Sequence, residues 1–153
     1  MLNYKYPIEN NSKINFEFDT KEIAMKEQYK ILVVDDHPVN IRVAHSFLTR
    51  LGYSAITIAE NGIKALESIN DDYNLILLDI GLPDIDGFEV CKAMREILAK
   101  QIPIIAVTAN LVDDNFMEKC KLAGINDVIS KPYSIDILEL KINRWAKNTK
   151  SQL

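Results

Sequence analysis

The sequence predicts an α/β fold with a doubly wound, five-stranded parallel sheet in the strand order 2-1-3-4-5. Five short apolar segments alternate strictly with segments of helical periodicity, which implies right-handed crossovers and a parallel sheet between two layers of helices. One of the apolar segments, residues 75–78, reads Leu-Ile-Leu-Leu without polar alternation and is typical of a strand buried on both faces. This strand order opens a crevice at the carboxyl ends of the first and third strands.

Each predicted strand is followed by a helix with its own start or stop signal. Pro38 suits the first turn of the helix after the first strand, and Gly52 ends that helix. Apolar residues four apart give it one apolar stripe, formed by Val39, Val43, Phe47 and Leu51 with Ala44 and Leu48 beside them. The predicted strands cover residues 31–34, 55–59, 75–78, 104–107 and 125–129. The later helices are expected after Gly62, after Gly87, over residues 111–123 and from residue 135 to Trp145.

Composition fits one globular domain with a normal core. The 153 residues are 48% hydrophobic and 26% charged, and the net charge of −4 disfavours direct nucleic-acid binding. The sequence shows neither an apolar run long enough to span a bilayer nor a secretory signal, so we expect a cytoplasmic protein without membrane contact. Cys91 and Cys120 are then expected to be reduced, buried thiols.

Residues 30–147 form the predicted domain, and residues 148–153 are a short tail. Residues 1–29 are interpreted as an extension or linker, with a short strand at residues 14–18 and a helical turn or two at residues 20–28.

Polar side chains suited to phosphate or metal chemistry stand at the carboxyl ends of four of the five strands. They are Asp35 and Asp36, Asp79, Thr108 and Lys131. Asp and Thr often serve only as helix caps or turn formers, but that explanation becomes weak when such residues arrive together at one sheet edge. Two carboxylates about 4 Å apart repel by roughly 4 kcal/mol at an effective dielectric near 20. A divalent cation would offset this repulsion, and hard oxygen donors favour Mg²⁺ over Zn²⁺.

The same residues support phosphoryl chemistry. A Mg²⁺ ion held by one or two carboxylates keeps positions open for phosphate oxygens. Asp79 could then attack phosphorus and form an aspartyl phosphate. Thr108 offers a hydroxyl and Lys131 a positive charge to the phosphoryl oxygens.

These residues resemble the response-regulator receiver domain of two-component signalling, a flavodoxin-like (βα)5 fold. The acid pair, Asp79, Thr108 and the Lys-Pro pair at residues 131–132 occur in the family's order, and residues 77–87 resemble its phosphoacceptor segment. The resemblance implies that Asp79 is the phosphoacceptor and that Thr108 and Lys131 contact the phosphoryl group. It also implies that Asp35, Asp36, Asp79 and the backbone carbonyl of Gly81 hold Mg²⁺, and that the Lys131–Pro132 peptide bond is cis.

Two features qualify the resemblance. Many receivers carry an aromatic switch residue three positions before the lysine, where this chain has Val128. Residues 35–40, Asp-Asp-His-Pro-Val-Asn, are similar to receivers attached to hybrid sensor histidine kinases.

Asp84 and Asp86 are expected to cap the helix after Gly87.

The leading functional prediction is a signalling module, not an enzyme, to which a histidine kinase or histidine phosphotransfer domain donates a phosphoryl group. The resemblance also allows phosphorylation-dependent self-association. The main alternative is a metal-dependent phosphohydrolase of the haloacid dehalogenase type, but that family needs a second acid where this chain has Gly81. A nucleotide-binding switch would need a Gly-rich phosphate loop, which this sequence does not contain. A flavin-binding module would have a phosphate loop after the first strand, where this chain has Asp35 and Asp36.

Overall fold

The computed structural model describes residues 11–150, and the side chains of residues 20–146. Its five strands form one parallel sheet in the order β2-β1-β3-β4-β5, which confirms the predicted fold class. The strands are β1 (Ile31–Val34), β2 (Ile56–Ala59), β3 (Leu75–Asp79), β4 (Ile104–Thr108) and β5 (Asp127–Ser130). The helices are α1 (Asn11–Gln28), α2 (Pro38–Arg50), α3 (Gly62–Ser68), α4 (Gly87–Ile97), α5 (Asp114–Ala123) and α6 (Ile135–Lys150).

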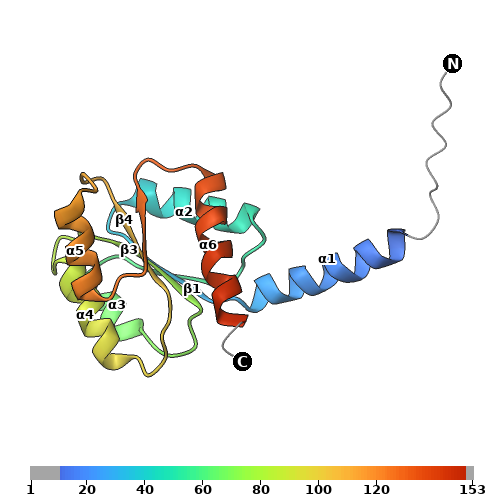
Figure 1. Ribbon diagram of the computed structural model, residues 1–153, viewed down its shortest axis with the longest axis horizontal. Helices are drawn as coiled ribbons and strands as arrows, with labels where there is room; N and C mark the ends of the chain where they lie inside the picture. Colours follow the sequence, from blue (N-terminus) through green and yellow to red (C-terminus); the bar gives the residue numbers. More distant parts are fainter. Residues whose placement is uncertain (1–10, 151–153) are drawn as a thin grey trace, which may run out of the picture.

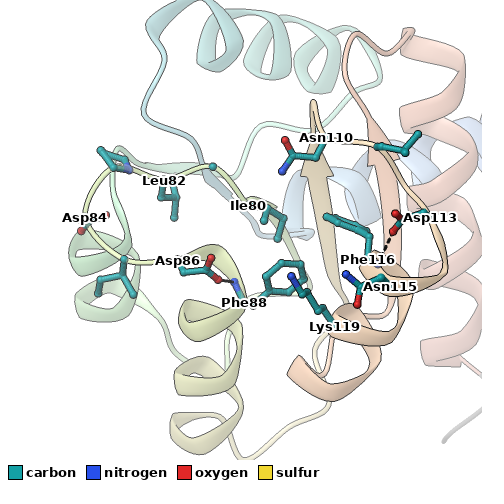
Figure 2. Close-up of a pocket in the computed structure, with 14 residues that line it drawn as sticks. Ile80, Leu82, Asp84, Asp86, Phe88, Asn110, Asp113, Asn115, Phe116 and Lys119 are labelled. Carbon is teal, nitrogen blue, oxygen red and sulfur yellow. Dashed lines mark hydrogen bonds between the residues drawn. The ribbon is translucent and has the colours of Figure 1, made fainter.

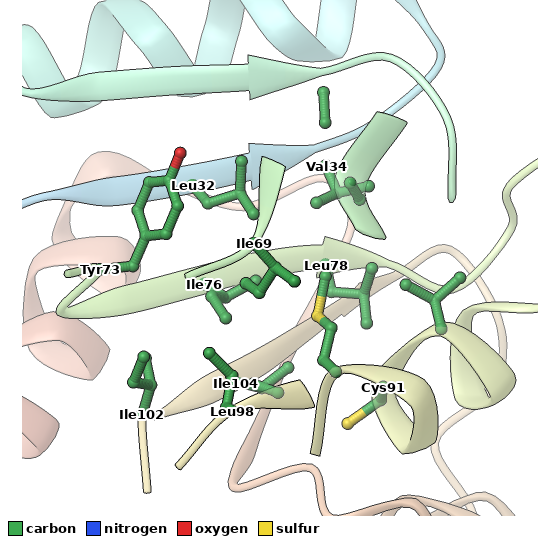
Figure 3. Close-up of a cluster of buried hydrophobic side chains, with 14 of the residues drawn as sticks. Leu32, Val34, Ile69, Tyr73, Ile76, Leu78, Cys91, Leu98, Ile102 and Ile104 are labelled. Atoms are coloured by element: carbon green, nitrogen blue, oxygen red, sulfur yellow. The ribbon is translucent and has the colours of Figure 1, made fainter. Parts of the chain in front are cut away.

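The sheet lies between two layers of helices, with α2 and α6 on one face and α3, α4 and α5 on the other (Figure 1). In β3, successive side chains enter opposite layers: Leu75 and Leu77 belong to the core cluster beneath α2 and α6. Ile76 and Leu78 belong to the cluster on the α3 and α4 side (Figure 3). Because all four are buried, the run without alternation is a central strand of the sheet.

Helix α2 buries a narrower face than its predicted stripe suggests. Ala44 and Leu48 are buried against the sheet, whereas Val39 is 50% exposed and Val43 is 38% exposed. The buried face of the helix is centred on Ala44 and Leu48, and the start of the stripe faces solvent. The prediction that Val39 and Val43 belong to the buried face is therefore wrong.

The ends of the elements follow their local signals. Gly52 and Gly124 adopt left-handed backbone conformations, with φ of +101° and +88°, after α2 and α5 as predicted. Helix α5 begins later than expected because the carboxylate of Asp113 accepts a hydrogen bond from the backbone N–H of Phe116 and caps the helix there. Strand β5 is shifted toward the carboxyl end and includes Ser130.

The segment before the sheet differs from its prediction. Helix α1 covers the residues expected to form a strand at 14–18, and Figure 1 shows it projecting from the rest of the fold. A lone strand needs a partner for its backbone hydrogen bonds, whereas a helix satisfies them internally. The last turn of α1 is attached through Lys26, whose Nζ donates to the carbonyl of Leu51 at 3.0 Å. Within the described part of the chain, no helix has the length and apolar character needed to cross a membrane.

A half-buried carboxylate joins the amino end of β5 to α6. The Asp127 side chain is 11% exposed, and it accepts hydrogen bonds from Lys141 Nζ at 2.7 Å, Trp145 Nε1 at 3.0 Å and Arg144 Nη1 at 3.1 Å. Burial alone would raise the pKa of Asp127, but hydrogen bonds from Lys141, Trp145 and the backbone N–H of Val128 outweigh it and lower the pKa below the ordinary 3.8. Trp145 thus packs against the core and also donates this hydrogen bond.

We expect Asp127→Asn to lower the free energy of unfolding by about 2 kcal/mol at pH 7, since charge-assisted bonds to α6 are lost. A carboxylate with a lowered folded-state pKa stabilises above its unfolded-state pKa, and this contribution disappears as pH falls through the lowered value. The stability difference between wild type and variant should therefore close below pH 3.8. Urea unfolding across pH checks this, with the exposed Asp72→Asn as the control. If the difference in unfolding free energy between wild type and Asp127→Asn stays constant down to low pH, the stabilisation does not come from the ionised carboxylate.

Candidate functional site

The polar residues predicted at the strand ends meet at one edge of the sheet. Asp35 directly follows β1, Asp79 ends β3, Thr108 ends β4, and Lys131 directly follows β5. Parallel register aligns these ends, with Asp79 opposite Val107. The side chains therefore converge because each strand delivers one of them to the same edge.

Three carboxylates form a cluster whose geometry suits a metal ion. One oxygen from each of Asp35, Asp36 and Asp79 can be chosen so that all three lie within 4.8 Å of one another. Asp35 and Asp79 are buried, with 6% and 7% of their surface exposed, whereas Asp36 is exposed. The cluster thus has an inner pair fixed by the sheet and an outer member open to solvent.

Lys131 connects the two buried acids. Its Nζ lies 3.1 Å from Asp35 Oδ2 and 3.1 Å from Asp79 Oδ2. Burial by itself would lower the pKa of Lys131, but the hydrogen bonds and negative charges of Asp35 and Asp79 outweigh it and raise the pKa above 10.5. The lysine is therefore cationic at neutral pH and offsets part of the repulsion between the acids.

Backbone contacts orient the remaining groups. Thr108 is buried, and its Oγ1 accepts a hydrogen bond from the backbone N–H of Asn110 at 3.0 Å. The backbone N–H of Lys131 donates to the carbonyl of Thr108 at 2.7 Å, and the following bond to Pro132 is cis, as the resemblance implied. The N–H of Gly81 donates to Asp79 Oδ1 at 3.0 Å. The two oxygens of Asp79 are thereby held by different groups.

A hollow of about 590 Å³ opens between the β3–α4 and β4–α5 loops (Figure 2). Phe88 and Phe116 meet edge to face on its inner side, with ring centroids 5.5 Å apart. Val128 packs, half-buried, against the cluster that contains Phe116. Phe88 and Phe116 are thus the aromatic rings that border this side of the site, while the switch position itself holds an aliphatic side chain.

The prediction that Asp84 and Asp86 both cap α4 is right for Asp86 only. Asp86 caps α4, since its Oδ1 accepts a hydrogen bond from the N–H of Phe88 at 2.8 Å. Asp84 does not cap α4. Its two oxygens accept hydrogen bonds from the N–H groups of Gly62 and Ile63, each at 2.9 Å, and these bonds hold the pKa of Asp84 below its ordinary value. Sequence reasoning missed this contact because the donors lie more than twenty residues earlier and carry no side-chain signal.

Residues 31–143 match the family model of the response regulator receiver domain. The hybrid signal transduction protein dokA of Dictyostelium discoideum is 41% identical over 120 residues, and the sensor histidine kinase RcsC of Escherichia coli strain K12 is 30% identical over 131 residues. These alignments cover 76% and 85% of this chain but only 7% and 14% of the two relatives. The chain is thus similar to a small part of much longer proteins.

Solved structures agree with the sequence relatives. The receiver domain of sensor histidine kinase PA1611 from Pseudomonas aeruginosa PAO1, with a magnesium ion coordinated in its active site cleft, is 36% identical with a TM-score of 0.68. That match covers 76% of this chain and 96% of the other. A two-component response regulator from Clostridium difficile is 30% identical with a TM-score of 0.71, covering 80% and 98%. The chain therefore belongs to the response regulator receiver family, whose domains act in two-component and phosphorelay signal transduction.

Proposed function

We propose that Asp79 accepts a phosphoryl group from a phosphohistidine donor in a Mg²⁺-dependent reaction. The observation that carries this proposal is the position of Asp79, which is buried at a strand end with a lysine ammonium 3.1 Å away and two further acids within reach. A carboxylate fixed in this way can form a bond to phosphorus, and the surrounding charges can hold the phosphoryl oxygens.

The donor set fits Mg²⁺. In the proposed site Asp35, Asp36 and Asp79 supply carboxylate oxygens, and the backbone carbonyl of Gly81 supplies a fourth oxygen ligand. Carboxylate and carbonyl oxygens are hard ligands of the kind this ion prefers. When bound, Mg²⁺ would neutralise the crowded acids and draw phosphoryl oxygens toward Asp79. The Mg²⁺-containing cleft of the PA1611 receiver supports this assignment.

In the proposed transfer, Asp79 forms the bond to phosphorus, and Lys131 and Thr108 bind the phosphoryl oxygens. An oxygen of Asp79 forms the new bond to phosphorus while the bond between phosphorus and the donor's imidazole nitrogen breaks. The imidazole nitrogen keeps that electron pair and takes up a proton from solvent, leaving a neutral histidine. Lys131 moves its ammonium contact from the carboxylate to a phosphoryl oxygen, and the hydroxyl of Thr108 donates to another. The phosphoryl group then adds a charge of about −1.5 to −2 at the sheet edge.

The surroundings suit a protein donor. Val39 and Val43 are exposed on α2, and Val43 lines a hollow together with Asp35 and Lys131. The two valines offer an apolar surface to a histidine kinase or histidine phosphotransfer domain. We assign residues 30–147 to the receiver, residues 1–29 to a linker and residues 148–153 to a tail. The hybrid relatives support a phosphorelay role. We place this role in the cytoplasm and expect phosphorylation to regulate self-association as well.

The module takes part in its own phosphorylation and slow dephosphorylation, and does not turn over an external substrate. The haloacid dehalogenase alternative finds no support among the relatives, and Gly81 cannot supply the second acid which that chemistry needs.

The direct test is incubation with a small acyl phosphate and Mg²⁺, followed by peptide mass spectrometry. We expect one phosphoryl group on Asp79, none on Asp79→Asn, and none in wild type with excess chelator. The exposed Asp72→Asn should be modified like wild type. Modification at another residue, or at an equal rate without Mg²⁺, would overturn the proposal.

Carboxylate crowding gives a second prediction. Asp36→Asn should raise the unfolding free energy of metal-free protein by about 1 kcal/mol, because one of three neighbouring negative charges is removed and solvent already screens it in part. That change corresponds to roughly 3 °C in melting temperature for a chain of this size. The same variant should bind Mg²⁺ more weakly. An equal or lower melting temperature in chelator would show that crowding does not destabilise the fold.

A further inference from the structure

The loop that carries Gly81 is closed at its base by a contact that only glycine allows. The N–H of Gly87 donates to the carbonyl of Ile80 at 3.2 Å. A Cβ at Gly87 would lie 2.5 Å from Ile80 Cα and 2.9 Å from the carbonyl oxygen of Asp79, so another side chain would force the loop apart. The two ends of residues 80–87 are thus held together directly beside Asp79.

The tip of the same loop is attached to a different part of the chain. Asp84 Oδ1 accepts from the N–H of Gly62 and Oδ2 accepts from the N–H of Ile63, each at 2.9 Å. A Cβ at Gly62 would lie 2.9 Å from Val90 Cγ2 and 3.2 Å from Ile85 Cβ, so the close approach of the two segments also depends on glycine. Figure 2 shows Asp84 at the outer end of the loop, away from Asn110.

The closed base and the attached tip of the loop restrict the backbone of residues 81–83 between them. Gly81 lies between the closed base and the tip, and Pro83 restricts the backbone further. Gly81 itself has open space around it, since a Cβ there would contact only Asp79 Oδ1, at 3.7 Å. Packing therefore does not fix the backbone at Gly81; the attachments on either side and the hydrogen bond from its own N–H to Asp79 Oδ1 do. Because this loop is ordered before a metal ion binds, the free energy of binding does not include the cost of ordering it.

We infer that Asp84 is a positioning residue for the metal site: by binding the first turn of α3, it holds the Gly81 carbonyl where Mg²⁺ binds. This inference rests on the proposed function, because the proposed metal site includes that carbonyl. Asp84 itself is not a ligand. Its effect reaches the site only through the backbone of residues 81–83.

A matched pair of variants separates the attachment from the charge. Asp84→Asn keeps one acceptor but turns an NH₂ group toward the second N–H, so one of the two bonds is lost. Asp86→Asn removes an equal charge from the same loop but keeps its cap, because Asn accepts the hydrogen bond of Phe88 equally well. We expect Mg²⁺ to bind Asp84→Asn about tenfold more weakly than Asp86→Asn in calorimetric titrations, a loss typical of removing groups that orient metal ligands.

A metal-free measurement keeps the test independent of the proposed function. Amide hydrogen exchange in chelator, followed by NMR, should be several-fold faster at Gly81 in Asp84→Asn than in wild type or Asp86→Asn, since the bond from Gly81 N–H to Asp79 loosens when the tip is freed. Unchanged exchange at Gly81, or equal Mg²⁺ affinity of the two variants, would overturn the role of Asp84. Failure of the wild-type protein to bind Mg²⁺ would instead overturn the proposed function, and the exchange result would still decide the attachment.

Discussion

The site depends on one ammonium group that lies between two buried carboxylates. Lys131 follows the edge strand β5, whereas Asp35 follows β1, 96 residues earlier, and the sheet brings them to 3.1 Å. Without that cation, Asp35 and Asp79 would be buried side by side with no positive charge between them, a costly arrangement in a protein interior. The pairing therefore stabilises a group of acids that the proposed phosphoryl transfer requires and that folding alone would disfavour.

The rest of the architecture keeps this arrangement in place. The fully buried strand β3 ends at Asp79, so the position of the carboxylate is set by packing on both faces of the sheet. Short backbone hydrogen bonds then orient the residues just after the strands, such as the bond from Lys131 N–H to the carbonyl of Thr108. Asp127 stabilises the opposite end of β5 through α6 and thereby supports the strand that delivers the lysine. Rigid elements carry the charged groups, and the loops complete the site.

The fold class could be predicted from the sequence because apolar segments that alternate with helices indicate a parallel sheet. The meeting of the five polar residues could be predicted as well, because the carboxyl ends of parallel strands lie at one edge of the sheet. Prediction from the sequence failed where tertiary contacts decide. Val39 is exposed because α2 packs on the sheet through Ala44 and Leu48, and spacing alone does not reveal which face packs. The role of Asp84 depends on backbone donors in a distant segment. The path of α1 was missed because three alternating apolar residues are too short to distinguish a strand from a helix.

A double-mutant cycle on Asp79→Asn and Lys131→Met, measured by urea unfolding in chelator, tests the central ion pair most directly. Both substitutions keep the approximate size of the side chain while removing its charge. We expect the two changes to be strongly non-additive, with a coupling of about 2 kcal/mol, as is typical of charged groups in direct hydrogen-bond contact. Changes that add to within about 0.5 kcal/mol would show instead that Lys131 does not offset the charge of Asp79.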